Sequence, residues 1–472
     1  MTKTGSLKGI LRELVRSGAG IAGLAMILIL LALSMYVVAL VPIGEMERWN
    51  RLDLWLDNPP STPPRWVTLF TGRSVPETVV VESEGAEAVL LEEASSIYSV
   101  ESIIRYDFHY DDFPSFLILS ISATYHKRQT SIHITWERPD GSRMPLIDYV
   151  LPSLDGGPPY IFARRFYLST DPDVKVRLSS YIYEKTGLIR PIEEIAPEKI
   201  LFSKIKSGVS LEKAEPLKGL YRLRVSVRGF DERDRLDSVR LSIGGKAHGL
   251  MGTDSYRRDL LTGILWGTPT ALLVGLLTAI ISTSSGLTLG AVSGYYLGRV
   301  DEVIQRFTDF MMSIPALPIL ILLSFLLKPS IWNIILLLAL FGWMGVCKVA
   351  RSMAMQLREE AYVEAARSIG ASDTWIILHH IMPQLLPYMF AQAALTVPSA
   401  ILSEAALSFL GLGDPTIVTW GRILHDAQMA GAAINNYWWW VVTPGILIAL
   451  VALSFSLLGN ALDRILQPKL RR

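Results

Sequence analysis

The hydrophobic pattern divides the chain into membrane-length apolar segments and one long stretch in which apolar and polar positions alternate. Six apolar segments reach about twenty residues, the length that an α-helix needs to cross a bilayer. One lies near the N-terminus, and five follow in the second half of the chain. The sequence therefore predicts six transmembrane helices, at Ala19–Val41, Thr270–Leu297, Ile304–Leu327, Ile331–Met353, Tyr388–Leu410 and Trp438–Leu458.

The region between the first two apolar segments is too long to be a loop. Its runs of alternating polarity predict strands with one buried face, and Pro139-Asp140-Gly141 predicts a turn. We expect a compact β-rich domain, such as a sandwich, with strands at Phe116–Tyr125, Thr130–Trp136, Val174–Tyr183 and Arg222–Arg228. The predicted domains are residues 1–43 (N-terminus and helix 1), 44–250 (the inserted domain) and 251–472 (a five-helix core).

Lysine and arginine residues near the ends of the apolar segments predict the orientation, because short cytoplasmic segments carry an excess of these residues. Four of them precede the first segment: Lys3, Lys8, Arg12 and Arg16. The N-terminus is therefore expected in the cytoplasm, and six spans would return the C-terminus to the same side. We expect a multi-pass protein of the plasma membrane with residues 44–250 outside the cell.

An amphipathic stretch separates the fourth and fifth apolar segments. Leu357–Ile369 has the apolar spacing of a helix, and Gly370 follows where a left-handed cap would end it. Ser372 or its neighbour Asp373 can cap a second helix, which Pro383 would end. The pattern predicts a helix, a glycine turn and a helix on the cytoplasmic side.

This stretch, at about residues 354–387, resembles the EAA motif of ABC-importer permeases, with Glu364-Ala365-Ala366, then Gly370, then Pro383. The resemblance implies that these five residues couple the chain to a cytoplasmic ATPase subunit. Small side chains would let a partner approach the backbone closely, and Glu364 could pair with Arg367 or across the interface. The alternative is an amphipathic helix that lies on the membrane surface.

Further ordered matches resemble the C-type subunit of the dipeptide and oligopeptide permease family. The segment Gly252–Asp259 is similar to the family's GTDxxGRD element, with Arg257 in place of the usual glycine, and Leu407–Gly413 and Leu458–Asp463 match other family strings. The resemblance implies an all-α bundle of six transmembrane helices, like a type I ABC importer permease. The β-rich extracellular domain inserted between helices 1 and 2 is a departure from most relatives.

The resemblance also implies partners. These are a second permease subunit in a heterodimer, two ABC ATPase subunits, an external solute-binding protein and membrane lipid. No cofactor is expected in this chain, because ATP and Mg would bind to the ATPase subunits.

Two patterns within the apolar segments suggest packing or a pathway. Four glycines recur at every fourth residue of the second segment, which favours close helix packing: Gly286, Gly290, Gly294 and Gly298. A polar stripe on the fifth segment could line a pathway or join helices, and an acidic residue beside it favours the pathway. These residues are Gln392, Thr396, Ser399, Ser403 and Glu404.

Several other functions are excluded or disfavoured by the sequence. A net charge of +1 argues against a nucleic-acid partner. The chain has no GxxxxGK[ST] loop to hold a nucleotide phosphate, so we expect a permease rather than an enzyme. It has neither an HExxH nor a CxxC pattern, and its lone Cys347 cannot form an intrachain disulfide, so we predict no metal site.

The sequence thus predicts the permease subunit of an ATP-driven importer that moves oligopeptides delivered by a solute-binding protein. The same machinery could carry oligosaccharides, dipeptides or nickel, and no residue discriminates among them. A receptor or sensor is the alternative from another class, disfavoured because the chain has only short cytoplasmic loops. The external domain could be a dock or lid for the solute-binding protein, or a passive spacer.

Overall fold

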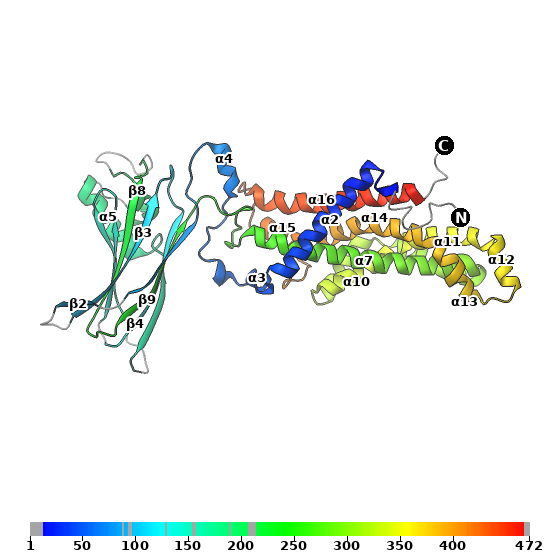
Figure 1. Ribbon diagram of the computed structural model, residues 1–472, viewed down its shortest axis with the longest axis horizontal. Coiled ribbons are helices and arrows are strands. Elements are labelled where there is room, and N and C mark those ends of the chain that lie inside the picture. Colours follow the sequence, from blue (N-terminus) through cyan, green and yellow to red (C-terminus); the bar gives the residue numbers. More distant parts are fainter. Residues whose placement is uncertain are drawn as a thin grey trace. The chain divides into compact units, whose positions relative to one another are not determined.

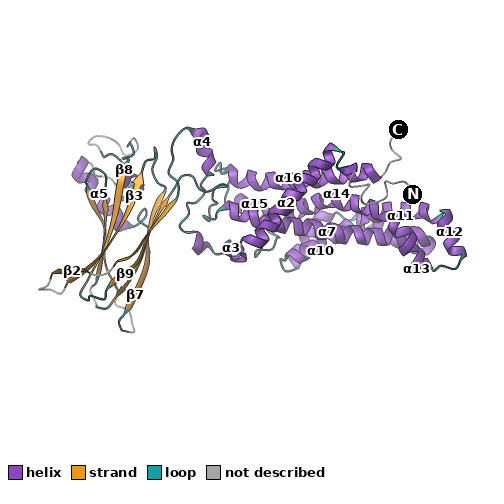
Figure 2. Ribbon diagram, viewed as in Figure 1, coloured by secondary structure: helices purple, strands orange, loops and turns teal. Residues whose placement is uncertain are grey.

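The structure is a computed structural model that describes residues 13–86, 89–92, 97–127, 130–152, 157–187, 189, 191–205 and 214–466. Its contacts divide the chain into two compact units (Figure 1). One unit combines the residues up to Arg51 with those from Leu260 onward, and the other is Leu52–Asp259. Figure 2 shows that helices make up the first unit and that strands dominate the second.

The helical unit contains long apolar helices and shorter amphipathic ones. Its elements are α2 (Gly18–Leu40), α3 (Ile43–Arg48), α7 (Leu260–Tyr296), α8 (Gly298–Ser313), α9 (Ala316–Leu326), α10 (Ile331–Gly342), α11 (Met344–Arg358), α12 (Ala361–Ser368), α13 (Asp373–Ile376), the π-helical turn η6 (Ile377–Ile381), α14 (Met382–Phe409), α15 (Trp420–Met429) and α16 (Trp438–Leu466).

Four helices of this unit are long and apolar enough to cross a membrane: α2, α7, α16 and the continuous helix Asp373–Phe409. Two further pairs qualify only together, because α8 and α9 meet at 84° and α10 and α11 at 41°. The predicted span at Ile304–Leu327 is therefore bent. Pro315 separates its two halves, and proline both restricts the preceding residue and cannot continue the helical hydrogen bonds. If each bent pair is one span, the described residues provide up to six.

Glycines let α7 lie directly against α11. A Cβ atom on Gly290 would lie 2.5 Å from the carbonyl oxygen of Cys347 and 2.6 Å from Cβ of Ala350. Gly286 and Gly294 meet the carbonyl oxygens of Trp343 and Arg351 in the same way, one turn to either side. These contacts leave no room for a side chain, as helix packing through small residues requires.

Gly298 differs from these three glycines. It begins α8 rather than lying on α7, its φ is +54°, and no atom lies within 4 Å of the Cβ position. Its role is therefore the turn between the two helices, where an L-residue would be strained, and not the packing that its spacing suggested.

We expect Gly290→Leu to destabilise the helical unit by about 1–3 kcal/mol, since the added atoms must push apart two backbones. Thermal unfolding of the purified full chain in lipid nanodiscs would measure the change. Gly345→Ala on α11 is the matched control, because no atom lies within 4 Å of its Cβ position. Equal unfolding midpoints for the Gly290 variant and the control would contradict the packing role.

The β-rich unit contains nine strands among the described residues. They are β1 (Val79–Ala86), β2 (Val89–Glu92), β3 (Ile97–Phe108), β4 (Phe116–Tyr125), β5 (Ser131–Glu137), β6 (Arg143–Val150), β7 (Tyr160–Phe166), β8 (Gly219–Gly229) and β9 (Arg235–Gly244). Its short helices are η2 (Leu52–Trp55), η3 (Arg65–Val67), α4 (Thr68–Thr71), α5 (Pro172–Thr186), η4 (Ile192–Glu194) and α6 (Pro197–Phe202).

Two antiparallel sheets form a sandwich around one hydrophobic core. One sheet has the strand order β1-β9-β4-β7 and the other β2-β3-β8-β5-β6. Alternate residues of each strand point inward, as in β5, where Ile132, Ile134 and Trp136 are buried between exposed or half-buried neighbours. Leu119 and Ile121 of the facing sheet belong to the same core. The β-rich domain and three of its four predicted strands are thus present.

The fourth predicted strand, Val174–Tyr183, is wrong, because this segment lies within helix α5. Its buried residues are Val174, Leu178 and Ile182, which follow the spacing of four of one helix face. Asp171 accepts hydrogen bonds from the first backbone N–H groups, and Pro172 occupies the first turn. The helix cap at Asp171 and the spacing of the buried residues therefore determine the structure of this segment, although its β-branched residues favour a strand.

Candidate functional site

The amphipathic stretch between α10 and α14 consists of two helices joined by a glycine turn, but its boundaries differ from the prediction. α11 ends at Arg358, and α12 begins only at Ala361. Between them Glu360 has an extended backbone, with φ −74° and ψ 138°. The single helix predicted from Leu357 to Ile369 is therefore broken, and α12 stands as a separate helix.

The glycine turn has the expected geometry. Gly370 has a φ of +87°, in the left-handed region that favours glycine, and nothing lies within 4 Å of its Cβ position. Its N–H donates to the Arg367 carbonyl oxygen, and the N–H of Ala371 donates to that of Ala366. The Ser372 hydroxyl accepts from the N–H of Trp375 and so caps α13. Gly370 thus reverses the chain while its own surface stays open.

Pro383 does not end the second helix as predicted. α13 continues through the π-helical turn η6 into α14, and Pro383 occupies the first turn of α14. A wider π-helical turn supplies a place where the missing N–H of proline can be tolerated. The glycine turn is consequently joined to a membrane-spanning helix without a break.

The inner face of the helix pair belongs to the same core as two long helices. Val363 and Ala366 of α12 and Ile376 of α13 are buried. They share a hydrophobic cluster with Ala291 of α7 and Ala350 of α11. Because interiors of this kind are close-packed, the helix pair is packed firmly against α7 and α11.

A polar joint reinforces this contact. The Tyr295 hydroxyl at the end of α7 donates to Oδ1 of Asp373 at 2.7 Å, and Nη2 of Arg367 donates to the same hydroxyl at 3.3 Å. The Arg367 guanidinium also lies 5.5 Å from the centre of the Tyr295 ring. Arg367 therefore pairs with α7. Tyr295 was missed by sequence reasoning, because only the tertiary fold brings it to the turn.

The outer face of the pair is open. Glu364 and Ala365 are exposed, and within the part of the chain that the structure describes Glu364 makes no ion pair. Ile369, beside Gly370, exposes 86% of its surface. A free carboxylate beside an exposed apolar side chain and a bare backbone turn is a surface suited to a protein partner.

Aromatic contacts hold α12 against the second helix. The Tyr362 ring lies 5.6 Å from His380, and Trp375 stacks on His379 at 4.7 Å. Burial, and then the nearby Glu360 carboxylate, raise the pKa of Tyr362. The two histidines are thus part of the packing of the pair.

A second polar network lies deeper in the helical unit. Asp301 of α8 accepts two hydrogen bonds of 2.5 Å from Arg351 of α11. Ser293 of α7 donates to the same carboxylate at 2.5 Å, and Gln305 donates to Ser293 at 2.9 Å. A bidentate arginine–carboxylate pair is the strongest of these bonds, and it fixes α8 against both neighbours.

The polar stripe on α14 separates into two parts. Gln392, Thr396 and Ser403 are half-buried and Ser399 is exposed, so this row lies at the surface of the chain. Glu404 is only 2% exposed, and it accepts a 2.6 Å hydrogen bond from Ser408. The stripe is thus available to a pathway or a neighbouring subunit, whereas Glu404 lies within the protein.

The element at residues 252–259 is tightly bonded within the β-rich unit. Nε of Arg258 lies 2.5 Å from Oδ2 of Asp254, and both side chains are almost fully buried. Arg257 has a φ of +67°, in the left-handed region that favours the glycine of the GTDxxGRD element that this segment resembles. Its Nη1 donates to the carbonyl oxygens of Leu56 and Asn58 at 2.9 and 3.0 Å. These bonds offset the backbone strain.

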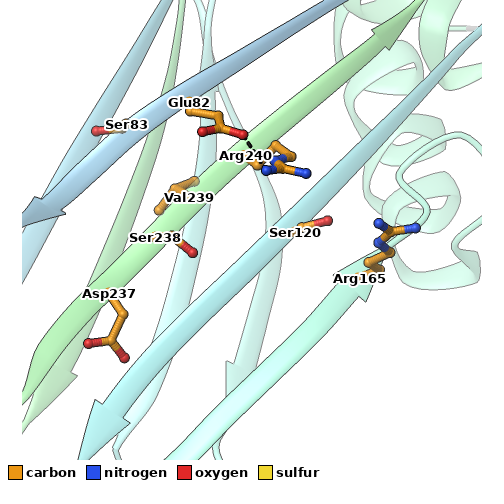
Figure 3. A pocket seen from close by; sticks show the side chains of 8 residues that line it. All are labelled: Glu82, Ser83, Ser120, Arg165, Asp237, Ser238, Val239 and Arg240. Atoms are coloured by element: carbon orange, nitrogen blue, oxygen red, sulfur yellow. Dashed lines mark ion pairs between the residues drawn. The ribbon is translucent and has the colours of Figure 1, made fainter. Parts of the chain in front are cut away.

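A shallow hollow of about 350 Å³ lies on the β1-β9-β4-β7 sheet (Figure 3). Ser83, Ser120 and Ser238 are among the residues that line it, and Arg240 forms a 2.5 Å ion pair with Glu82 of the neighbouring strand. Both Arg165 and Arg240 also lie 3.7 Å from Asp57. Because its charges are paired internally, the hollow does not form a trap for a strongly charged ligand.

Residues 286–472 match the family model described as "Binding-protein-dependent transport system inner membrane component". The dipeptide transport system permease protein DppC of Bacillus subtilis (strain 168) is 35% identical over 222 residues, which are 47% of this chain and 69% of that protein. The oligopeptide transport system permease protein OppC of the same organism is 32% identical over 222 residues, 47% of this chain and 72% of that protein.

Two more similarities extend the comparison. The probable D,D-dipeptide transport system permease protein DdpC of Escherichia coli (strain K12) is 36% identical over 219 residues, 46% of this chain and 72% of that protein. A solved chain of the MetNI methionine ABC transporter is 18% identical, with 45% of this chain and 96% of that chain covered and a TM-score of 0.32.

Proposed function

Because this chain belongs to the family of binding-protein-dependent transport system inner membrane components, we propose that it carries oligopeptides inward through a bundle driven from its cytoplasmic helix pair. It is a multi-pass membrane protein and a permease subunit of an ABC importer, and ATP is hydrolysed by separate subunits of such importers. The names of its relatives favour peptides over oligosaccharides and a permease over a sensor.

The observation that carries the proposal is the open surface at Glu364, Ala365 and Gly370. An ATPase subunit that binds there would meet a carboxylate with no ion pair among the described residues, a methyl group and a backbone turn without a side chain. Ala366 lies behind them in the core, and Pro383 lies where the pair continues into α14. ATP and Mg would bind to the ATPase subunits, and this chain would supply no cofactor site.

The motion would reach the membrane through the contacts that join α12 and α13 to α7 and α11. Through the close-packed cluster and the Tyr295 hydrogen bond, movement of α12 and α13 would be transmitted to α7 and α11. Gln392, Thr396, Ser399 and Ser403 would then face the pathway or the second permease subunit of a heterodimer. Two ATPase subunits and an external solute-binding protein would complete the importer.

We assign both termini to the cytoplasm and the β-rich unit to the outside. The arginine and lysine residues near the span ends support this orientation. With up to six spans, the glycine turn and the ATPases would then lie on one side. The insertion of the β-rich unit between helices 1 and 2 would place it beside the solute-binding protein.

The test is ATPase stimulation of the reconstituted complex by its binding protein loaded with oligopeptides or with oligosaccharides. We expect oligopeptides to stimulate ATP hydrolysis and to accumulate inside proteoliposomes. Stimulation by oligosaccharides alone would overturn the assignment of oligopeptides as the substrate. Failure of ATPase subunits to co-purify with the chain would overturn the importer assignment itself.

A further inference from the structure

Four apolar side chains project from one corner of the β-rich unit. Leu69 and Phe70 of α4 expose 80% and 81% of their surfaces, Leu250 exposes 60% and Trp66 exposes 41%. We refer to these four residues as the apolar knob. Isolated apolar residues are common on protein surfaces, but a cluster of large ones marks an interaction site.

The apolar knob is held in place by specific bonds. Nε1 of Trp66 donates to the Leu250 carbonyl oxygen at 2.9 Å, and the Trp66 and Phe70 rings meet edge to face at 6.3 Å. The N–H of Arg65 donates to the Gly249 carbonyl oxygen at 2.9 Å. The side chains are therefore presented by a fixed backbone, so little ordering entropy is lost when they are covered.

Its chemistry fits the interfacial region of a bilayer. Tryptophan is enriched at that depth, and leucine and phenylalanine enter the boundary between headgroups and acyl chains. Arg73 follows Phe70 by three residues and is exposed, so its charged end can lie among lipid phosphates. Arg65 is exposed as well, but its Nε pairs with Oε1 of Glu77 at 2.6 Å. An apolar group with basic residues at its rim is typical of a surface that binds lipid.

The covalent connection keeps the knob close to a membrane helix. Only nine residues lie between Leu250 and Leu260, where α7 begins. The ten Cα–Cα steps from Leu250 to Leu260 span at most about 35 Å when extended. These residues fold back on themselves, since Thr253 and Asp259 form an antiparallel bridge. α7 has 37 residues and is about 55 Å long, well beyond the roughly 30 Å hydrocarbon core, so its ends reach the headgroups.

We propose that the apolar knob inserts into the headgroup region of the leaflet next to the start of α7 and anchors the β-rich unit to the lipid surface. This inference requires only that α7 spans the membrane, and it is independent of the substrate and of the ATPase contacts. The solute-binding protein and the second permease subunit are the competing occupants.

The test uses the full chain, assembled with its partners in proteoliposomes, with a fluorophore on Leu69→Cys. Cys347, the only cysteine of the sequence, is fully buried and can stay in place. Val150→Cys on β6, whose side chain is 63% exposed, is the matched control. Lipids that carry a nitroxide near the headgroup quench the fluorescence of a label that lies in the membrane, and iodide quenches the fluorescence of a label that is exposed to water. Phe70→Cys provides a second labelled site if the first variant assembles poorly.

We expect the label at residue 69 to be quenched by the nitroxide lipid, and its iodide quenching to be several-fold weaker than at residue 150. Equal iodide quenching at both sites, with no effect of the nitroxide lipid, would overturn the proposal. Protection of residue 69 from both quenchers would overturn it as well, because a protein partner would then cover the knob.

Discussion

Glu364→Arg is expected to lower uptake by the reconstituted importer at least about tenfold while ATP hydrolysis continues. The carboxylate is exposed and makes no ion pair within the described residues, so its charge is free for the partner subunit. Reversal of a charge that pairs across an interface costs several kcal/mol. The contact between the helix pair and the ATPase subunit would therefore weaken, and ATP hydrolysis would no longer drive transport efficiently. The measurement is the number of peptides imported per ATP hydrolysed in proteoliposomes.

The same charge reversal at Glu232, which is exposed in the β-rich unit, serves as the control and should leave the ratio unchanged. Replacement of Gly370 with a bulky residue should act in the same direction as Glu364→Arg, because a side chain would fill the open turn and strain a φ of +87°. We call the exposed outer face of the helix pair around Glu364, Ala365, Ile369 and Gly370 the coupling surface. Normal transport with unchanged ATPase assembly in these variants would contradict its role in coupling.

The joint at the end of α7 leads to the second expected result. Combining Tyr295→Phe with Asp373→Asn should lower the number of peptides imported per ATP several-fold, while the ATPase subunits still co-purify. The change removes a hydrogen bond to a charged group, worth about 1.5–3 kcal/mol, but keeps the Tyr295 ring in its cluster. Movement of α12 and α13 would then reach α7 less completely.

Tyr296→Phe, at the next residue of α7, is the matched control. The Tyr296 side chain is 43% exposed, and its hydroxyl makes no hydrogen bond within the described residues. A variant that hydrolyses less ATP and imports proportionally fewer peptides would speak against the joint, since coupling would then be intact. An unchanged ratio would show that the apolar cluster alone transmits the motion.

Patterns that repeat along the chain predicted much of this structure. The apolar segments located α2 closely and the first residues of α10 and α16, because the length requirement of a bilayer is strict. The segment predicted at Ile331–Met353 runs on past the end of α10 into α11. Strand alternation located β4 at Phe116–Tyr125, and the preference of glycine for positive φ located the turn at Gly370. Each of these patterns depends only on residues that are close together in the sequence, so it can be recognised without knowledge of the tertiary fold.

Signals that depend on distant parts of the chain were weaker. The bend between α8 and α9 and the π-helical turn before Pro383 are places where proline is accommodated, and the sequence does not say whether a proline ends a helix or only reshapes it. Glu404 was named only as a possible pathway residue, and its enclosure by Ser408 and the surrounding protein depends on which elements pack around it. The role of Tyr295 depends wholly on which helices meet.

The exposed side chains of the coupling surface also bear on how the subunit is produced. Ile369 is 86% exposed, and Leu378 and Trp375 on the second helix expose 55% and 44% of their surfaces. A permease copy synthesised in excess of its ATPases would present these groups to water and to other unassembled copies. The exposed outer face of this short helix pair would therefore require that the subunits be expressed in balanced amounts. It would also require that unassembled copies be degraded promptly.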